Sequence, residues 1–143
     1  MPAIKLLLHI NAPQEKVYEA ISSIKGIQNW WTVDTSGDDK AGGVLQFRFG
    51  NQGPDFKVIE LKPASSVTWE CVNGPSDWLG TQLIFQADQM EGKTRLRFQH
   101  INWKEESDFF ANCAFSWSRY LESLRQYCQT GIGEAFGSPG YRK

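Results

Sequence analysis

Few polar side chains in this 143-residue chain are placed to do chemistry inside an apolar core. The clearest is His100, which continues the apolar face of Leu96 and Phe98 at the end of a predicted strand. An inward-facing histidine could orient a ligand or move a proton, although more often such a ring bonds a neighbouring backbone group or water. Three further groups could face inward, without forming an evident acid–base pair: Glu60, Cys71 and Tyr120.

Local motifs of known catalytic or metal centres are absent from the sequence. It has no phosphate-binding loop, no G-x-S-x-G, no H-E-x-x-H and no cluster of metal ligands, so neither a metal nor a cofactor is expected. A binding site must therefore be built from apolar side chains. The chain has 6 Trp and 9 Phe, and large rings both fill cores and line apolar ligand pockets.

The segment from Asp108 to Gln129 is the element around which the other residues are arranged. Its apolar residues recur at spacings of four and three, which predicts one face of a helix roughly 35 Å long. Ser107 is the expected N-cap and Gly131 the expected terminator. The stripe is either plain core or, in part, the wall of a ligand cavity; it consists of Phe110, Ala114, Trp117, Leu121, Leu124 and Cys128.

The preceding residues read mainly as strands. Residues 4–10 alternate, Pro13 then starts a short helix, and a second short helical turn leads to Trp30 and Trp31. Strands with regular turn punctuation follow up to His100. The inner face of residues 56–62 is undetermined. Phe56 and Val58 would place one face inward, whereas Ile59 and Leu61 would place the other face inward. Residues 131–143 look like a mobile tail.

These elements predict an α+β fold of the helix-grip type. A curved antiparallel sheet of about six to seven strands carries two short helices after its first strand, and a long C-terminal helix packs on its apolar face. Residues 1–131 are expected to form a single domain, and residues 132–143 a flexible C-terminal tail.

Composition limits the partners and the compartment. A net charge of −1 and the lack of a basic cluster give no reason to expect nucleic acid. No apolar run approaches the length of about 18 residues that a membrane helix needs, and the N-terminal residues read as a strand rather than a signal peptide. Cys113 and Cys128 lie too far apart on one helix to pair, so reduced thiols and a cytoplasmic location are expected.

Several short features, in this order, resemble one family. They are Ala12-Pro13 with Val17, Tyr18, Ala20 and Ile21; Trp30-Trp31; Gly43; Val58 to Pro63; Val67-Thr68-Trp69; Leu83 and Phe85; the Gly92 hairpin; and Trp117 with Leu121, Leu124 and Gly131. The chain resembles the START/Bet v1-like (SRPBCC) superfamily. Within it, the chain is most similar to stand-alone domains related to the activator of Hsp90 ATPase.

The resemblance implies a cavity between the sheet and the long helix, opening near the elbow made by the two short helices. His100 would then lie at its mouth. The candidate ligand-binding residues are Trp30, Trp31, Phe47, Phe49, Trp69, Phe85, Phe98, His100, Phe110, Trp117 and Tyr120.

Three functions are compatible with such a cavity and such relatives. The leading expectation is a module that binds a small hydrophobic or aromatic molecule. An enzyme of the polyketide cyclase or hydrolase type would use the same cavity, and whether any reaction is catalysed stays open. An Hsp90-activator-like role in protein interaction or stress response is the third. A homodimer and a protein partner stay open as well.

Overall fold

Segments of alternating apolar residues form a single curved sheet in the computed structural model, which describes residues 1–141. All neighbouring strands are antiparallel, in the order β1-β7-β6-β5-β4-β3-β2. The strands are β1 Ile4–Ile10, β2 Asp34–Gly37, β3 Val44–Arg48, β4 Asp55–Lys62, β5 Ser66–Asn73, β6 Gln82–Met90 and β7 Lys93–Ile101.

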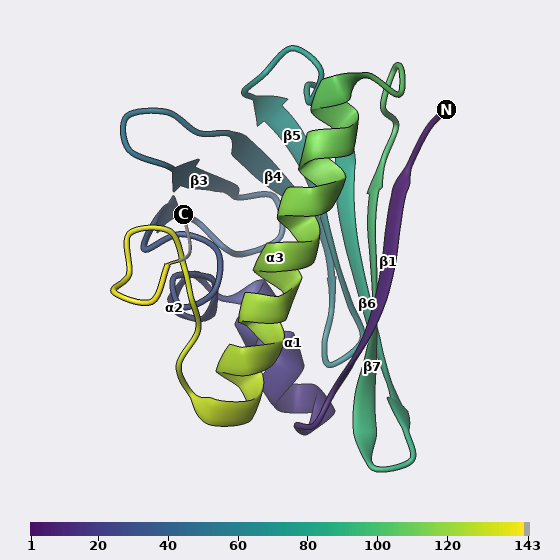
Figure 1. Cartoon of the computed structure of the whole chain (residues 1–143), viewed down its shortest axis with the longest axis vertical. Helices are drawn as coiled ribbons and strands as arrows, with labels where there is room; N and C mark the ends of the chain where they lie inside the picture. Colours follow the sequence, from purple (N-terminus) through teal and green to yellow (C-terminus); the bar gives the residue numbers. More distant parts are fainter. Residues whose placement is uncertain (142–143) are drawn as a thin grey trace.

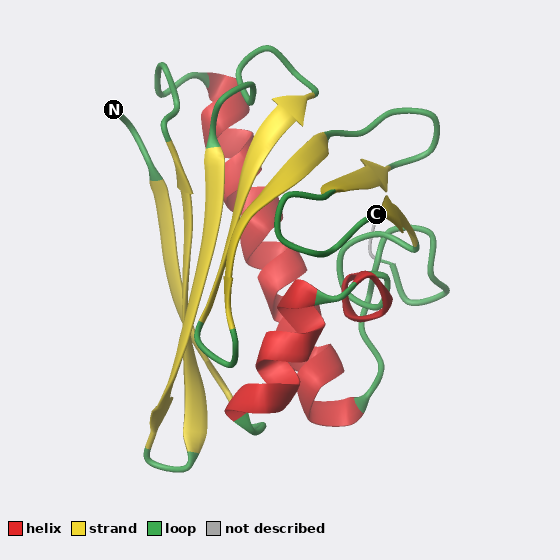
Figure 2. Ribbon diagram, turned by 180° about the vertical axis from the view of Figure 1, so that it is seen from behind, coloured by secondary structure: helices red, strands yellow, loops and turns green. Residues whose placement is uncertain are grey.

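The helices are α1 Gln14–Ser22, α2 Ile24–Ile27 and α3 Asp108–Thr130. Helix α3 crosses the concave face of the sheet, and α1 and α2 lie at one end of it (Figures 1 and 2). The predicted α+β helix-grip architecture is therefore confirmed.

Helix α3 begins and ends where the sequence predicts. The Ser107 hydroxyl accepts a hydrogen bond from the Phe110 amide at 3.3 Å, and Gly131 adopts a left-handed φ of 89° while its amide bonds the Tyr127 carbonyl. The buried face follows the predicted stripe through Trp117, Leu121 and Leu124. Apolar burial against the sheet therefore holds this helix in place.

A β-bulge explains why the inner face of residues 56–62 could not be assigned. The pairing of β4 with β5 shifts register between Val58 and Glu60. Phe56 and Val58 point inward, Ile59 is exposed, and Leu61 packs against the core again. One inserted residue thus reverses the parity along the strand. Glu60 is exposed on the outer face and is no part of the interior.

The elbow of α1 and α2 depends on close backbone contact. A Cβ at Gly26 would lie 2.7 Å from the Cα of Ala20, so glycine is needed where α2 turns back on α1. The indole N–H of Trp30 donates to the Ala20 carbonyl at 2.8 Å. This bond fixes Trp30 inside the elbow.

The C-terminal segment differs from the flexible tail that the sequence suggests. Phe136 donates its amide to the Trp31 carbonyl at 2.8 Å and accepts from the Val33 amide at 3.0 Å. The Glu134 amide donates to the Ser123 hydroxyl at 2.7 Å, and Ala135 is fully buried. Residues 132–141 therefore pack as part of the domain. Residues 142 and 143, also assigned to the tail, lie outside the described residues.

A buried histidine ties α3 to the sheet. The Trp117 indole N–H donates to His100 Nδ1 at 3.1 Å, so the ring proton of His100 sits on Nε2 and is donated to Thr81 Oγ1 at 2.9 Å. Thr81 in turn donates to the Trp78 carbonyl at 2.6 Å. Every polar atom of this buried chain is satisfied, and His100 is fully enclosed rather than at a cavity mouth.

Two further expectations bear on compartment and partners. All three cysteines are buried free thiols, as predicted. None of the helices within residues 1–141 has the length and apolar content that crossing a membrane requires.

Replacing Leu124 with aspartate should strongly destabilise the protein. Leu124 is fully buried, and Leu124→Asp would place an unpaired carboxylate between helix and sheet. We expect a loss of several kcal/mol in the free energy of unfolding, measured by urea titration. Ala111→Asp, at an exposed position of the same helix, should change it little. Equal stabilities of the two variants would contradict the packing described.

Stability should fall in acid because of His100. Burial lowers its folded-state pKa from 6.5 to about 3, so unfolding takes up a proton at acidic pH. The stability that the neutral ring contributes is full above about pH 6.5 and is lost as the pH falls toward about 3. We expect His100→Gln to flatten this dependence in urea titrations, whereas the exposed His9→Gln should keep it. Parallel pH profiles for wild type and His100→Gln would contradict this role.

Candidate functional site

A cleft of about 670 Å³ opens between the N-terminal half of α3, the β3–β4 turn and the β5–β6 loop. Its walls thus come from three segments that are distant in the sequence. Six aromatic rings line it: Trp31, Phe49, Trp78, Phe109, Trp117 and Tyr120. Uncharged polar side chains complete its lining and rim: Asn51, Gln52, Asn73, Asn112 and Ser116.

Trp31 is the centre of the aromatic floor. Its ring centroid lies 5.0 Å from that of Trp117 and 5.7 Å from that of Phe49, and 4.4 Å from the buried ring of Phe47. On its inner side it stacks on Trp69 at 6.5 Å with an interplanar angle of 8°. Tilted and edge-to-face neighbours hold each ring in one orientation. The floor is therefore formed before any ligand arrives.

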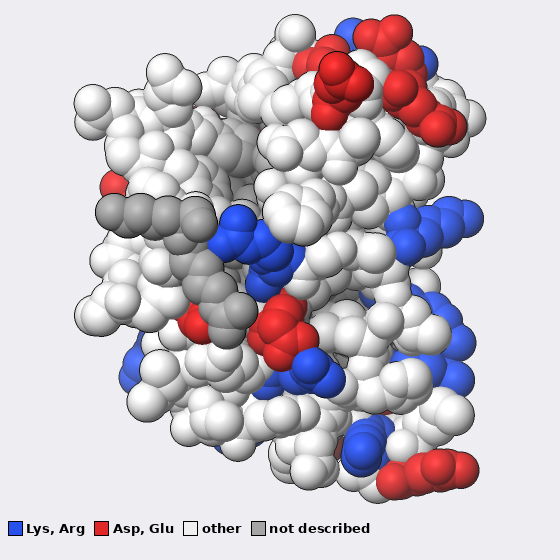
Figure 3. All heavy atoms as spheres, viewed as in Figure 1, with Lys and Arg blue, Asp and Glu red and all other residues white. Residues whose placement is uncertain are grey.

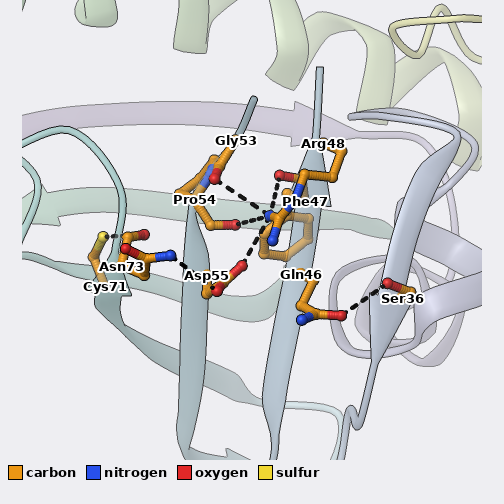
Figure 4. Close-up of polar contacts among 9 residues, drawn as sticks. All are labelled: Ser36, Gln46, Phe47, Arg48, Gly53, Pro54, Asp55, Cys71 and Asn73. Atoms are coloured by element: carbon orange, nitrogen blue, oxygen red, sulfur yellow. Dashed lines mark hydrogen bonds and ion pairs between the residues drawn. The ribbon is translucent and has the colours of Figure 1, made fainter. Parts of the chain in front are cut away.

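The β3–β4 turn is braced by an ion pair. Arg48 Nη1 donates to Asp55 Oδ1 at 2.8 Å and to the carbonyl of Phe47 at 3.0 Å (Figure 4). Asn73 at the end of β5 donates to the other oxygen of Asp55 at 3.3 Å. A Cβ at Gly53 would lie 1.8 Å from the Phe47 carbonyl oxygen, so the turn closes only with glycine there. These contacts hold one rim of the cleft.

The C-terminal segment supports rings that line the cleft. The Phe136 ring lies 5.4 Å from Phe49 in an edge-to-face contact, and the Tyr141 ring lies 5.1 Å from Phe136. Tyr120 contacts Phe49 at 6.2 Å. The segment expected to be a tail therefore positions two rings that line the cleft.

Apart from Arg48, the titratable groups that line the cleft are neutral near pH 7. Burial raises the pKa of the Cys113 thiol to about 11. Burial, and a hydrogen bond with Tyr141, raise the pKa of the Tyr120 phenol. Among the described residues that line the cleft, Arg48 alone carries a charge, and it is paired with Asp55. The cleft thus combines rings with uncharged polar groups.

The structure divides the eleven predicted ligand-binding residues into three groups. Those that line the cleft are Trp31, Phe49, Trp117 and Tyr120. Those buried in the core away from it are Trp30, Phe47, Trp69, Phe85, Phe98 and His100. Phe110 is half-buried and packs edge-to-face on Trp103 at 5.1 Å, outside the cleft.

The position of the opening differs from the expectation. The predicted mouth lay at the elbow of α1 and α2, but Trp30 and Trp31 are 0% and 2% exposed there. The cleft opens at the other end of the sheet, beside the start of α3. The elbow is closed because Trp30 stacks on Trp31 at 6.2 Å and bonds the α1 backbone.

Sequence reasoning missed Trp78, Phe109 and the amide side chains of the rim. The signal available for Trp78 was a large ring directly after the polar loop from Asn73 to Asp77. Nothing in the sequence pairs this loop with the turn at Asn51 and Gln52, because the pairing follows from the sheet order. Within residues 1–141, no three His, Cys, Asp or Glu side chains gather closely enough to hold a metal ion.

Comparison with solved structures finds this fold repeatedly. The Aha1 dimer from Colwellia psychrerythraea is 39% identical, with a TM-score of 0.86 over 93% of this chain and 100% of that chain. A Bacillus halodurans protein is 25% identical, with a TM-score of 0.71 over 90% of this chain and 98% of that one. CalU16 from Micromonospora echinospora, at 15% identity and a TM-score of 0.77, covers 91% of this chain and 67% of its own.

A search of curated proteins finds no match. The family model described as "Activator of Hsp90 ATPase homolog 1-like protein" matches residues 11–129, which run from the start of the helical elbow to the end of α3. Because that span includes the elbow, six of the seven strands and nearly all of the long helix, the chain belongs to the Activator of Hsp90 ATPase homolog 1-like protein family.

Proposed function

We propose that this protein binds a small, flat, uncharged and largely aromatic molecule in the cleft beside α3. The observation that carries the proposal is the lining itself, in which six rings contribute to the walls of a cleft of about 670 Å³. Cavities of this size and composition are typical of small-molecule sites. The chain's membership of its family is compatible with ligand binding and does not by itself identify a ligand.

The rings favour a flat ligand. Trp31 and Trp117 lie 5.0 Å apart with an interplanar angle of 41°, and Trp78 stacks on Trp117 at 6.4 Å with an angle of 15°. Ligand rings would extend this arrangement by stacking and edge contacts. Such pairs contribute about 0.5–1.5 kcal/mol each beyond the burial of their area.

The rim favours a ligand with neutral polar groups at its edge. Asn51, Gln52 and Asn112 are exposed at the opening, and their amides can both donate and accept hydrogen bonds. No carboxylate lines the cleft among the described residues, so a cationic group would find no ion-pair partner there. An anion would have to compete with Asp55 for Arg48. Figure 3 shows mainly uncharged side chains around the upper part of α3 and acidic ones at its N-terminal end.

Binding is favoured over catalysis by what the cleft lacks. No pair of titratable side chains suited to general acid–base work lines it within the described chain. The single buried histidine has both ring nitrogens engaged, by Trp117 and by Thr81. An enzyme of the cyclase or hydrolase type would need groups that this lining does not supply.

We propose in addition that the protein associates as a homodimer. The support is the relative from Colwellia psychrerythraea, which is 39% identical over nearly the whole chain and is described as a dimer. A cytoplasmic location stays a prediction.

Filling the cleft should abolish ligand binding. The neutral dye N-phenyl-1-naphthylamine should bind with saturable emission enhancement and a dissociation constant on the order of micromolar. Ser116 is half-buried on the cleft side of α3, so Ser116→Phe should weaken binding at least about tenfold. Ala111→Phe adds the same ring at an exposed position outside the cleft and should leave the titration unchanged.

Two outcomes would contradict the ligand proposal. One is the absence of any saturable dye response from the folded wild-type protein. The other is equal affinity of Ser116→Phe and Ala111→Phe, which would place the dye elsewhere. An Hsp90-activator-like interaction would then become the leading function.

The cleft should discriminate against charge and be insensitive to pH. We expect the neutral dye to bind about tenfold or more tightly than its anionic analogue 8-anilinonaphthalene-1-sulfonate, in fluorescence titrations at moderate salt. The affinity of the cleft for the neutral dye should be constant from about pH 5 to 9. The Cys113 thiol, with a pKa of about 11, stays protonated throughout this range. Tighter binding of the sulfonate would show that a cationic group faces the ligand.

A further inference from the structure

The two edges of the sheet differ in how they are protected. Strand β2 is four residues long, and Thr32 just before it pairs with Phe136 of the C-terminal segment. Strand β1 is seven residues long and is paired along its full length with β7. Its other side has no partner strand among the described residues. Figures 1 and 2 both show β1 along the margin of the molecule, with no element beyond it.

The β1 edge has few of the devices that usually prevent pairing. Natural edges carry prolines, bulges, charged side chains such as lysine, or very short strands. The register of β1 with β7 is regular from Ile4 to Ile10, with no bulge and no proline. Its middle residue, Leu7, is 56% exposed, and Lys5 is its one permanently charged side chain. A regular and apolar open edge is suited to accept another strand.

The space beside β1 can accommodate the side chains of an added strand. A groove of about 350 Å³ runs between β1 and α3, lined on the strand side by the half-buried Leu6 and Leu8. Ser118, Leu121, Glu122 and Arg125 line its helix side. The groove lies on the concave face, whereas Leu7 points to the outer face. An incoming strand would therefore meet leucine side chains of β1 on both of its faces.

We propose that two copies of this chain associate by antiparallel pairing of β1 with β1, about a two-fold axis at Leu7. This inference rests on the homodimer proposed above and is independent of the ligand. An open edge presents unpaired amide and carbonyl groups, and their complement is a second strand. The pairing joins the two sheets into one continuous sheet.

The sequence of β1 is self-complementary in this register. Leu7 faces Leu7 across the axis, Leu6 faces Leu8, and Lys5 faces His9. The lysine of one chain therefore does not lie opposite the lysine of the other. Apolar cross-strand pairs of this kind contribute about 0.2–1 kcal/mol each. In a C2 interface the same surface of both copies must be complementary to itself. The symmetric arrangement of leucines around Leu7 meets this requirement.

The test is the mass in solution. Wild-type protein in sedimentation or light-scattering experiments at tens of micromolar should have twice the chain mass of 16.3 kDa. Leu7→Lys places two ammonium groups face to face on the axis and should shift the protein to the single-chain mass. Ile59→Lys changes another exposed apolar residue, 43% exposed on β4, and should remain dimeric.

Each result has one interpretation. A monomeric wild type would overturn both the homodimer and its interface. A Leu7→Lys variant that stays dimeric would overturn the β1 interface while leaving the homodimer. Hydrogen exchange gives a second test without mutation: the β1 amides that point away from β7 should lose protection on dilution of the wild type, whereas those of the interior strand β6 should not. Unchanged β1 protection through dissociation would also reject the interface.

Discussion

The hydrogen bond from the Trp117 indole to His100 Nδ1 is the contact on which the other features depend. An indole has one donor, and at this depth in the core His100 is its acceptor, at 3.1 Å. Losing the partner would leave a buried donor unsatisfied at a cost of about 1–3 kcal/mol. Apolar packing alone would tolerate small rotations of α3 about its axis. The directional hydrogen bond to His100 selects one of them. The same bond sets the side of α3 that faces the cleft.

Trp117 joins the core to the cleft. Its indole nitrogen enters the buried chain of His100 and Thr81, while its ring packs on Trp31 and Trp78. The cleft floor is thus the outer surface of the core and not a separate structure. Rings held by core contacts lose little conformational freedom when a ligand binds. A cleft built in this way selects by shape, since its walls cannot easily move to suit a different ligand.

The sequence predicts those features that local patterns determine. The stripe of α3, its caps at Ser107 and Gly131, and the alternating strands follow from periodicity. The position of the cleft opening cannot be predicted from periodicity, because it depends on the approach of Trp78 to the β3–β4 turn across the sheet. The inward-facing residues of β4 could not be assigned from alternation, because the bulge at Ile59 reverses the alternation within the strand. The C-terminal segment is polar and rich in glycine, yet the backbone bonds of Phe136 with Trp31 and Val33 hold it in place.

The two proposed sites flank the buried face of α3. Asn112 and Ser116 line the cleft, whereas Ser118 and Glu122 line the groove beside β1; at 3.6 residues per turn the two pairs are about 120° apart around the helix. The sheet order also places β1 at the opposite edge from β3 and β4. Between the sites lies the buried face of α3, anchored by Leu124 and by the His100 bond. Since coupling between sites needs an element with two arrangements, and this helix is held in one, ligand binding and dimerisation should be independent.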